Sequence, residues 1–287
     1  MYTTLISATQ LQSLMASGQP VVVFDCSFEL MKPAEGDAQY QACHIAGAVR
    51  ANLDRHMSAP KGAADAASGG RHPLPSREHF AAWLGSVGLA PDVQVVAYDR
   101  QGANYCGRLW WMLKWAGHEA VAVLDGGLQA WQASGGAVET GTGQERPANS
   151  YPLGAPRAVL TNTDTVLSQL GNPVQTVLDA RAAPRFRGEV EPLDPVAGHI
   201  PGALNRLFSD NIGPDGRFKP ADQLRAEFDT LLAGRDPASV VHHCGSGVSA
   251  LPNLIAMELA GLGRAALYAG SWSEWCSDSR RPVAKSI

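Results

Sequence analysis

The feature that most constrains this chain is an internal repeat. Residues 21–25, Val-Val-Val-Phe-Asp, precede residues 43–48, Cys-His-Ile-Ala-Gly-Ala, and the same order recurs in residues 176–179, Thr-Val-Leu-Asp, and 198–203, Gly-His-Ile-Pro-Gly-Ala. The two aspartates are 154 residues apart and the two histidines 155 residues apart. Near-equal offsets indicate a duplicated structural unit. A chain of 287 residues is also long enough to form two cores of ordinary size.

The repeat extends to the segments that end in Asp99 and Cys244, because residues 93–99 parallel residues 239–244. In each half, short apolar runs alternate with longer helical patterns, which predicts parallel strands that are buried on both faces. The predicted fold class is therefore α/β, with two tandem domains, each a mainly parallel sheet flanked by helices. Ligands bind such sheets at the carboxyl ends of the strands, where Cys244 is expected to lie.

Composition places the boundaries and excludes several classes of function. We expect a first domain over residues 1–140, a linker rich in Gly, Thr, Ser and Pro over 141–156, and a second domain over 157–287. The formal net charge is −4 and no run of Lys or Arg stands out, so neither nucleic acid nor an anionic membrane is an expected partner. The N-terminal segment lacks the basic start and apolar run of a signal peptide, and no membrane span is predicted.

The cysteines point to a reducing compartment. They form neither a Cys-x-x-Cys pair nor a cluster with histidine at zinc-ligand spacing: Cys26, Cys43, Cys106, Cys244 and Cys276. The odd number and the absence of pairing predict a cytoplasmic protein without a structural metal. No cofactor-binding motif is recognised either, so no cofactor is expected.

Residues 244–250, Cys-Gly-Ser-Gly-Val-Ser-Ala, follow a strand-like run and precede a helical pattern. The glycines at 245 and 247 allow the backbone to curl so that successive N–H groups point at one centre and form an anion nest. Those dipoles and the following helix N-terminus favour the thiolate of Cys244. The nest can also hold a persulfide anion formed by attack on a sulfur donor. A buried, inert cysteine is the alternative for an isolated thiol.

The chain resembles a tandem-domain rhodanese-type sulfurtransferase over nearly its whole length. The resemblance rests on residues 178–181 (Leu-Asp-Ala-Arg), 198–203, 244–250 and 270–275 (Gly-Ser-Trp-Ser-Glu-Trp). It implies a catalytically silent first domain, and a second domain whose nucleophile is Cys244. The predicted loop that holds the transferred sulfur comprises Gly245, Ser246, Gly247, Val248 and Ser249.

The loop is most similar to that of 3-mercaptopyruvate sulfurtransferases, since thiosulfate sulfurtransferases tend to carry basic residues just after the cysteine. Resemblance to the mercaptopyruvate members also implies a relay of Ser246, His72 and Asp54. A small-molecule sulfur donor and a thiol or cyanide acceptor are the expected partners, with a thioredoxin-like reductant as a candidate acceptor.

In the family that the chain resembles, two arginines bind the carboxylate of the substrate, and this sequence matches only one of them. Arg185, in an Arg-Phe pair, supplies the first arginine, but Leu193 stands where the second is expected. Arg187 and Arg206 are the alternatives, and either could equally be an ordinary surface arginine. The departure at Leu193 keeps thiosulfate open as the alternative donor.

Two other functions remain as more distant alternatives. A phosphatase of the Cdc25 type also begins an anion loop with cysteine, but it needs an arginine six residues later, where this chain has Ala250. A binding module that has lost its chemistry would not need Cys244 in a glycine-bearing loop. Residues that recur in both halves, such as His44 and His199, are predicted to be structural, because only one half has the cysteine.

Overall fold

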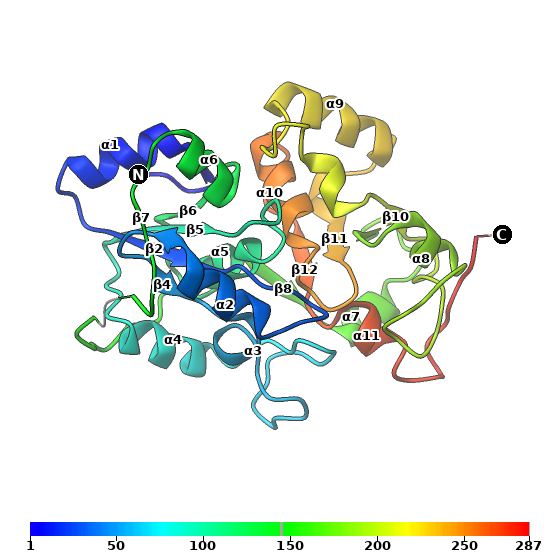
Figure 1. The fold of residues 1–287 in the computed structure, drawn as a ribbon. Helices are drawn as coiled ribbons and strands as arrows, with labels where there is room; N and C mark the ends of the chain where they lie inside the picture. The colour runs from blue at the N-terminus through cyan, green and yellow to red at the C-terminus, as the bar shows by residue number, and fades with distance from the viewer. Residues whose placement is uncertain (144–145, 287) are drawn as a thin grey trace. The chain divides into compact units, whose positions relative to one another are not determined.

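The computed structural model describes residues 1–143 and 146–286. They divide into two compact units (Figure 1). The first unit contains most of the chain up to Arg157, together with Ile212–Phe218; the second contains the remainder, together with Pro60–Leu74. The domain ranges 1–140 and 157–287 remain predictions, and these two short segments depart from them.

Each of these two segments, Pro60–Leu74 and Ile212–Phe218, forms a hydrogen bond with the unit to which it belongs. Within the second unit, the N–H of Arg71 donates to Ser273 Oγ over 2.9 Å. Within the first unit, the N–H of Phe218 donates to Asp125 Oδ1, also over 2.9 Å. Each segment therefore packs with the unit that satisfies its backbone.

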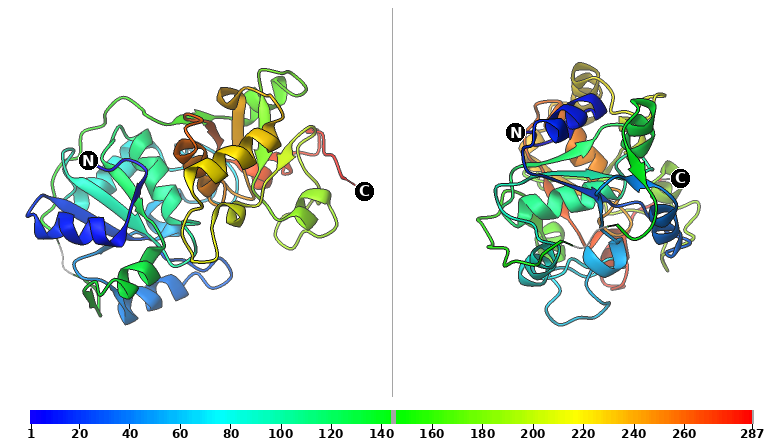
Figure 2. Two further views of the ribbon diagram at one scale, coloured as in Figure 1. Left: turned by 90° about the horizontal axis from the view of Figure 1, so that it is seen from above. Right: turned by 60° about the vertical axis from the view of Figure 1, so that its left-hand side comes forward.

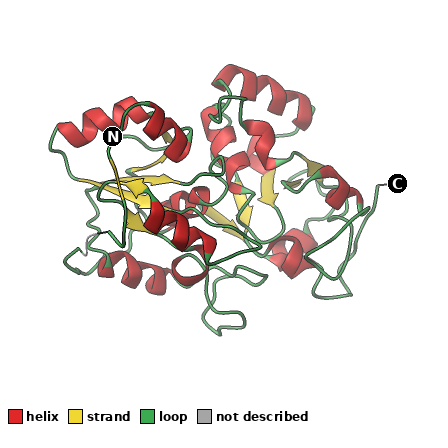
Figure 3. Ribbon diagram, in the orientation of Figure 1, coloured by secondary structure: helices red, strands yellow, loops and turns green. Residues whose placement is uncertain are grey.

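Both units interleave short strands with helices, as Figure 3 shows by colour. The strands of the first unit are β1 (Leu5–Ile6), β2 (Val21–Asp25), β3 (His44–Ile45), β4 (Val49–Arg50), β5 (Gln94–Tyr98), β6 (Val121–Leu124) and β7 (Val138–Glu139). Its helices are α1 (Ala8–Ala16), α2 (Glu35–Ala42), α3 (Leu53–His56), α4 (Arg77–Ser86), α5 (Cys106–Trp115) and α6 (Gly127–Ala133).

The second unit repeats the pattern with fewer residues in strands. Its strands are β8 (Val159–Thr161), β9 (Thr176–Asp179), β10 (Leu204–Asn205), β11 (Val240–His243) and β12 (Ala266–Tyr268). Its helices are α7 (Thr163–Ser168), α8 (Ala183–Arg187), α9 (Ala221–Leu232), α10 (Leu251–Leu259) and α11 (Ser271–Trp275), with 3₁₀ turns η1 (Phe208–Asn211) and η2 (Pro237–Ser239).

The two main sheets share one topology. The first has the order β1-β6-β5-β2-β4 and the second β8-β12-β11-β9-β10, and every pairing in both is parallel. Strands β5 and β11 occupy the central position of their sheets. The sequence repeat is thus a repeat of fold, and the predicted α/β class is confirmed.

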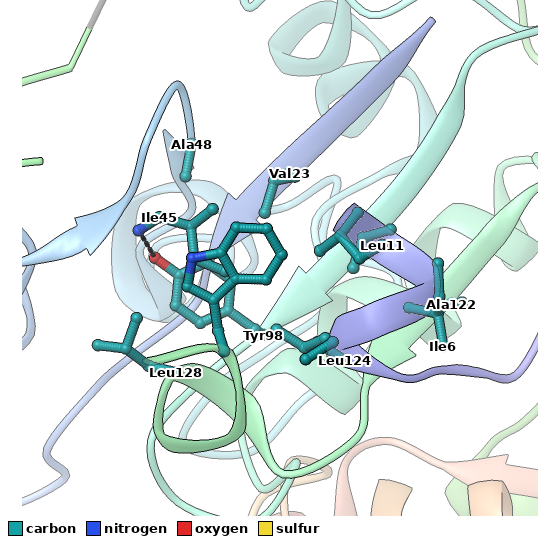
Figure 4. Packing of buried hydrophobic residues seen from close by; sticks show 12 residues of the cluster. Ile6, Leu11, Val23, Ile45, Ala48, Tyr98, Ala122, Leu124 and Leu128 are labelled. Carbon is teal, nitrogen blue, oxygen red and sulfur yellow. Dashed lines mark hydrogen bonds between the residues drawn. The ribbon is translucent and has the colours of Figure 1, made fainter. Parts of the chain in front are cut away.

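Buried side chains on one face of the first sheet form a core with α1 and α6. Leu11 from α1 and Leu128 from α6 meet Val23 and Tyr98 from the central strands (Figure 4). The hydroxyl of Tyr98 accepts the N–H of Ile45 over 3.0 Å, which satisfies a buried polar group inside this core. Figure 2 shows further views of the same layers, with helix α5 on the opposite face. Among the helices that the structure describes, none is long and apolar enough to cross a membrane.

Candidate active site

Cys244 directly follows β11, the central strand of the second sheet (Figure 1). Its side chain is buried, with 2% relative exposure. Seven residues later the chain enters α10 at Leu251. The thiol therefore lies in a strand-to-helix loop at the carboxyl end of a parallel strand, where open α/β sheets bind ligands.

The first unit shows what this loop geometry can bind. Asp99 follows β5 at the position equivalent to Cys244. Its Oδ1 accepts the N–H groups of Gln101 and Ala103 over 2.9 and 3.1 Å. Its Oδ2 accepts those of Tyr105 and Cys106 over 2.8 and 2.9 Å. The loop of the first unit is thus an anion nest that is filled by its own carboxylate.

The loop of the second unit has no such internal anion. Gly247 has a φ of +72° and matches Gly102, which has a φ of +67° in the first unit, so the two loops turn alike. In the part of the chain that the structure describes, four loop N–H groups donate to no protein acceptor: those of Gly245, Ser246, Val248 and Ser249. These donors are available to an anion at Cys244.

Ser271 fixes the backbone of the cysteine from the neighbouring strand end. The N–H of Cys244 donates to Ser271 Oγ over 3.2 Å, and that hydroxyl donates to the carbonyl of Tyr268 over 3.0 Å. Ser271 is fully buried and has a φ of +56°, a conformation that Gly127 adopts at the equivalent place in the first unit. A side chain kept in this strained conformation beside the thiol indicates a constraint from the site. The motif at residues 270–275 contains Ser271, but its role cannot be derived from the sequence.

Two members of the predicted relay meet within the second unit. His72, carried by the segment Pro60–Leu74, shares a 2.8 Å hydrogen bond between its Nδ1 and Ser246 Oγ. Both side chains are buried. Asp54 lies in α3 of the first unit, where Asn52 Oδ1 accepts its N–H, and its part in the relay stays a prediction.

Arg185 lies among carboxylates. Its Nη2 is 2.6 Å from Glu191 Oε1 and 3.3 Å from Asp194 Oδ2, and both acidic side chains are almost fully buried. Its Nη1 is 3.7 Å from the position that a Cβ would take at Gly245. The guanidinium therefore borders the cysteine loop, as the resemblance implied.

Both alternatives for the second arginine of the clamp form ion pairs in the structure. Arg187 is partly exposed and pairs with Glu189 over 2.6 Å. Arg206 pairs with Glu227 over 2.6 Å and donates to Asn211. Ion pairing alone does not decide against them, since Arg185 is paired with carboxylates as well, and a part in donor binding stays a prediction for both.

The backbone at Leu193 and Asp194 helps to hold the side chain of Glu191. Its N–H and that of Asp194 both donate to Glu191 Oε1, over 3.1 and 3.2 Å. The turn at residues 191–194 thereby orients two carboxylates toward Arg185.

A second arginine, Arg181, extends this charged cluster into the core. It binds Asp179 over 2.6 Å and Glu191 over 3.2 Å. Burial alone would lower the pKa of Arg181, but its interactions with Asp179, Glu191 and Cys244 raise it. Burial likewise lowers the pKa of the neighbouring His243, which keeps that imidazole neutral. Arg181 is thus a permanent cation near Cys244.

The histidines that recur in both halves have matching structural roles. His44 stacks on Tyr40 and shares a hydrogen bond with its carbonyl, and His199 does the same with Phe186, with ring centroids 3.9 Å apart in both pairs. These matching contacts agree with a structural role for both histidines.

Two thiols of the first unit, those of Cys26 and Cys106, are buried. Burial, followed by the charges of Asp25 and Asp99, raises the pKa of Cys26 well above 9.0. Burial and Asp99 do the same for Cys106. These two cysteines stay protonated and inert at neutral pH.

Comparison with known proteins decides the family. The rhodanese-like domain family matches residues 7–134 and again residues 162–278. The chain belongs to the rhodanese family. A Pseudomonas aeruginosa protein named "Probable 3-mercaptopyruvate sulfurtransferase" is 49% identical over 284 residues, which cover 98% of this chain and 97% of that protein. The thiosulfate sulfurtransferase of Cricetulus griseus is 32% identical over 286 residues, covering 96% of this chain and 92% of that one.

Solved structures agree with these relatives. The 3-mercaptopyruvate sulfurtransferase from Leishmania major superposes with a TM-score of 0.84 and 30% identity, over 98% of this chain and 76% of that chain. The predictions of a tandem rhodanese fold and of a sulfurtransferase are confirmed. Within this rhodanese, the roles of the individual site residues remain predictions.

Proposed function

We propose that this rhodanese moves a sulfur atom from 3-mercaptopyruvate to a thiol or cyanide acceptor through a persulfide on Cys244. The observation that carries the proposal is the contrast between the two equivalent loops. In one, four N–H groups close on the carboxylate of Asp99. In the other, a cysteine takes the place of the aspartate, and no acceptor among the described residues is recorded for the N–H groups of Gly245, Ser246, Val248 and Ser249. Such a loop stabilises an anionic sulfur at residue 244.

In the first step the Cys244 thiolate attacks the sulfur of the donor. An S–S bond forms, the C–S bond of the donor breaks, and its electron pair passes to the enolate of pyruvate. The proton of the donor thiol ends on the methyl carbon, so that pyruvate and an enzyme persulfide anion are the products. Ser246 and His72 lie 2.8 Å apart beside the nucleophile and can carry that proton. Asp54 is proposed to orient His72.

In the second step the acceptor takes the outer sulfur. A thiolate attacks this atom, the S–S bond breaks, and Cys244 returns to the thiolate while the acceptor becomes a persulfide; cyanide becomes thiocyanate in the same way. A thioredoxin-like dithiol is a suitable acceptor. The free cysteines fit a reducing environment, and we propose the cytoplasm as the location.

Thiosulfate is the alternative donor. It is favoured by the departure at Leu193 and by a relative that is named a thiosulfate sulfurtransferase. With thiosulfate the leaving group is sulfite, and no enolate needs a proton. The Ser246–His72 pair would then be dispensable for the first step.

The test compares kcat/KM for 3-mercaptopyruvate and thiosulfate with cyanide as the common acceptor. We expect a preference for 3-mercaptopyruvate, and a loss of at least about a hundredfold for this donor in Ser246→Ala, in the range typical of a lost proton relay. Cys244→Ser should abolish turnover with both donors and should gain no sulfur atom by mass spectrometry after treatment with the donor. Residual turnover in Cys244→Ser would refute the nucleophile, and a preference for thiosulfate would refute the donor.

A further inference from the structure

We propose that His199 and the N–H of Gly202 form a binding site for a free carboxylate on the second unit, at the place that the first unit fills with its own Glu139. The inference goes beyond the proposed function, because none of these residues is assigned a part in sulfur transfer. It comes from a comparison of the two copies of one turn, residues 43–48 and 198–203. The class of ligand is a small organic acid, and acetate is its simplest probe.

In the first unit this site is filled by a side chain of the protein itself. Glu139 lies on β7, which pairs with β3 so that Glu139 is opposite His44. Its Oε1 lies 3.1 Å from His44 Nε2 and accepts the N–H of Gly47 over 2.9 Å. The hydrogen bond from Gly47, followed by that from His44, lowers the pKa of Glu139. This pair of donors therefore stabilises a carboxylate.

The strand that carries Glu139 has a counterpart in the second unit. Ala284 lies opposite His199 in an antiparallel bridge. Each of these two residues donates its N–H to the carbonyl of the other over 2.9 Å. Since His199 is the repeat of His44, Ala284 occupies the position of Glu139.

The turn and the ring also have the same geometry in both units. Gly47 has a φ of +76° and Gly202 one of +78°. The N–H of the residue after each glycine donates to the carbonyl of an isoleucine three residues earlier, over 2.9 and 3.1 Å. Nδ1 of His199 lies 2.7 Å from the carbonyl oxygen of Phe186, and the ring stacks on that residue as His44 does on Tyr40. Nε2 of His199 is therefore presented beside the N–H of Gly202.

The two sites differ in the acceptor. An alanine side chain ends at Cβ, so Ala284 cannot reach Nε2 of His199. Over residues 1–143 and 146–286, no hydrogen-bond partner is recorded for that nitrogen or for the N–H of Gly202. His199 is 6% exposed, whereas Gly202 is exposed, so the two donors are reached from the side of the turn. A ligand that brings its own carboxylate satisfies both.

The carboxylate binds together with a proton. The carbonyl of Phe186 can only accept, so Nδ1 of His199 carries a hydrogen. In the neutral ring Nε2 then has no hydrogen, and it can donate to a carboxylate only when the ring becomes an imidazolium. The bound state is thus an ion pair with a second hydrogen bond from Gly202, the arrangement that Glu139 forms in the first unit.

The charges around His199 favour an anion. The titratable and charged side chains on the neighbouring segments are Asp179, Arg181, Arg187, Glu189, His243 and Lys285. Both acidic groups are paired with arginines. Burial lowers the pKa of His243, which keeps that ring neutral. The stem of Lys285 packs against Gly198, directly before His199, so an incoming carboxylate meets positive charge.

The first test observes the ring of His199 by NMR in the full chain at pH 7. Its resonance is identified by its contacts with Phe186 and by its loss in His199→Asn. Acetate replaces chloride at constant ionic strength, so that general screening does not change. We expect acetate to move the Nε2 resonance toward the imidazolium position along a saturable curve, while His44 does not respond because Glu139 fills its site. A resonance of His199 that acetate moves no more than chloride does would overturn the proposal.

Reciprocal variants exchange the states of the two sites. Ala284→Glu should fill the second site from within and remove the response of His199 to acetate. It should also raise the ratio of imidazolium to neutral ring at least about tenfold over Ala284→Gln, a control of equal length, as expected for a charged hydrogen bond. Glu139→Ala should open the first site, so that His44 responds to acetate.

Two results with these variants would also contradict the proposal. If the response of His199 persisted in Ala284→Glu, acetate would be acting elsewhere. If His44 did not respond in Glu139→Ala, the shared pair of donors would not be sufficient to bind a carboxylate. No readout depends on sulfur transfer, so the outcome is independent of the test of the proposed function.

Discussion

A methyl group added at Gly247 should be far more damaging than one added at Gly102, although both glycines have nearly the same backbone conformation. Their φ angles are +72° and +67°. An alanine at either position bears the cost of a left-handed conformation, about 1–2 kcal/mol. At Gly102 the new Cβ meets only the side chain of Ile212 at 3.4 Å, an ordinary contact.

At Gly247 the Cβ would lie 2.2 Å from the carbonyl oxygen of Ala269, where ordinary contact begins at 3.4 Å. Since this neighbour is backbone, the loop and the end of β12 must move apart. Overpacking of this kind adds about 1–3 kcal/mol. The total for Gly247→Ala is therefore about 2–5 kcal/mol, against about 1–2 kcal/mol for Gly102→Ala. The shift also displaces Ser271, which accepts the N–H of Cys244.

Hydrogen exchange followed by mass spectrometry gives the free energy of opening for each unit separately. We expect Gly247→Ala to weaken protection in β11 and β12 and to lower kcat at least about tenfold through the displaced nucleophile. Gly102→Ala should affect only the first unit and leave kcat near that of the wild type. Equal losses of stability in the two variants would refute the reasoning, because the close approach to Ala269 would then carry no cost.

Two further predictions concern charge. Asp99→Asn should destabilise the first unit by about 3 kcal/mol or more, because the amide cannot accept all four N–H groups; urea unfolding of the variant checks this, and a loss below about 1 kcal/mol would contradict the anion-nest interpretation. Burial lowers the pKa of His242 from 6.5 to about 3. The folded state therefore binds a proton at His242 less readily than the unfolded chain does. The contribution of neutral His242 to the free energy of unfolding is intact above pH 6.5 and is lost as the pH falls toward 3. For this group the free energy of unfolding should change by about 1.4 kcal/mol per pH unit within that range. Chemical denaturation between pH 7 and 4 should show a smaller pH dependence in His242→Leu than in the wild type. An unchanged pH dependence in that variant would count against the assignment.

Much of this protein follows from its sequence alone. The repeat of Asp25 as Asp179 and of His44 as His199 predicts two copies of one fold, because a duplicated pattern of buried strands must be satisfied by a duplicated sheet. The position that is proposed to react can also be predicted from neighbouring residues. A cysteine followed by two glycines between a strand and a helix is read directly from residues 244–250.

The distant residues that border Cys244 could not be obtained in this way. Arg71 and Gly245 are 174 residues apart, and their proximity depends on the segment Pro60–Leu74 packing with the second unit rather than with its own repeat. Arg187 and Arg206, the alternatives that the sequence suggests near Leu193, pair with Glu189 and Glu227. Short-range patterns determine strands, loops and the nucleophile because they depend on neighbouring residues. Which distant guanidinium borders that nucleophile is decided only by the packing of the whole unit.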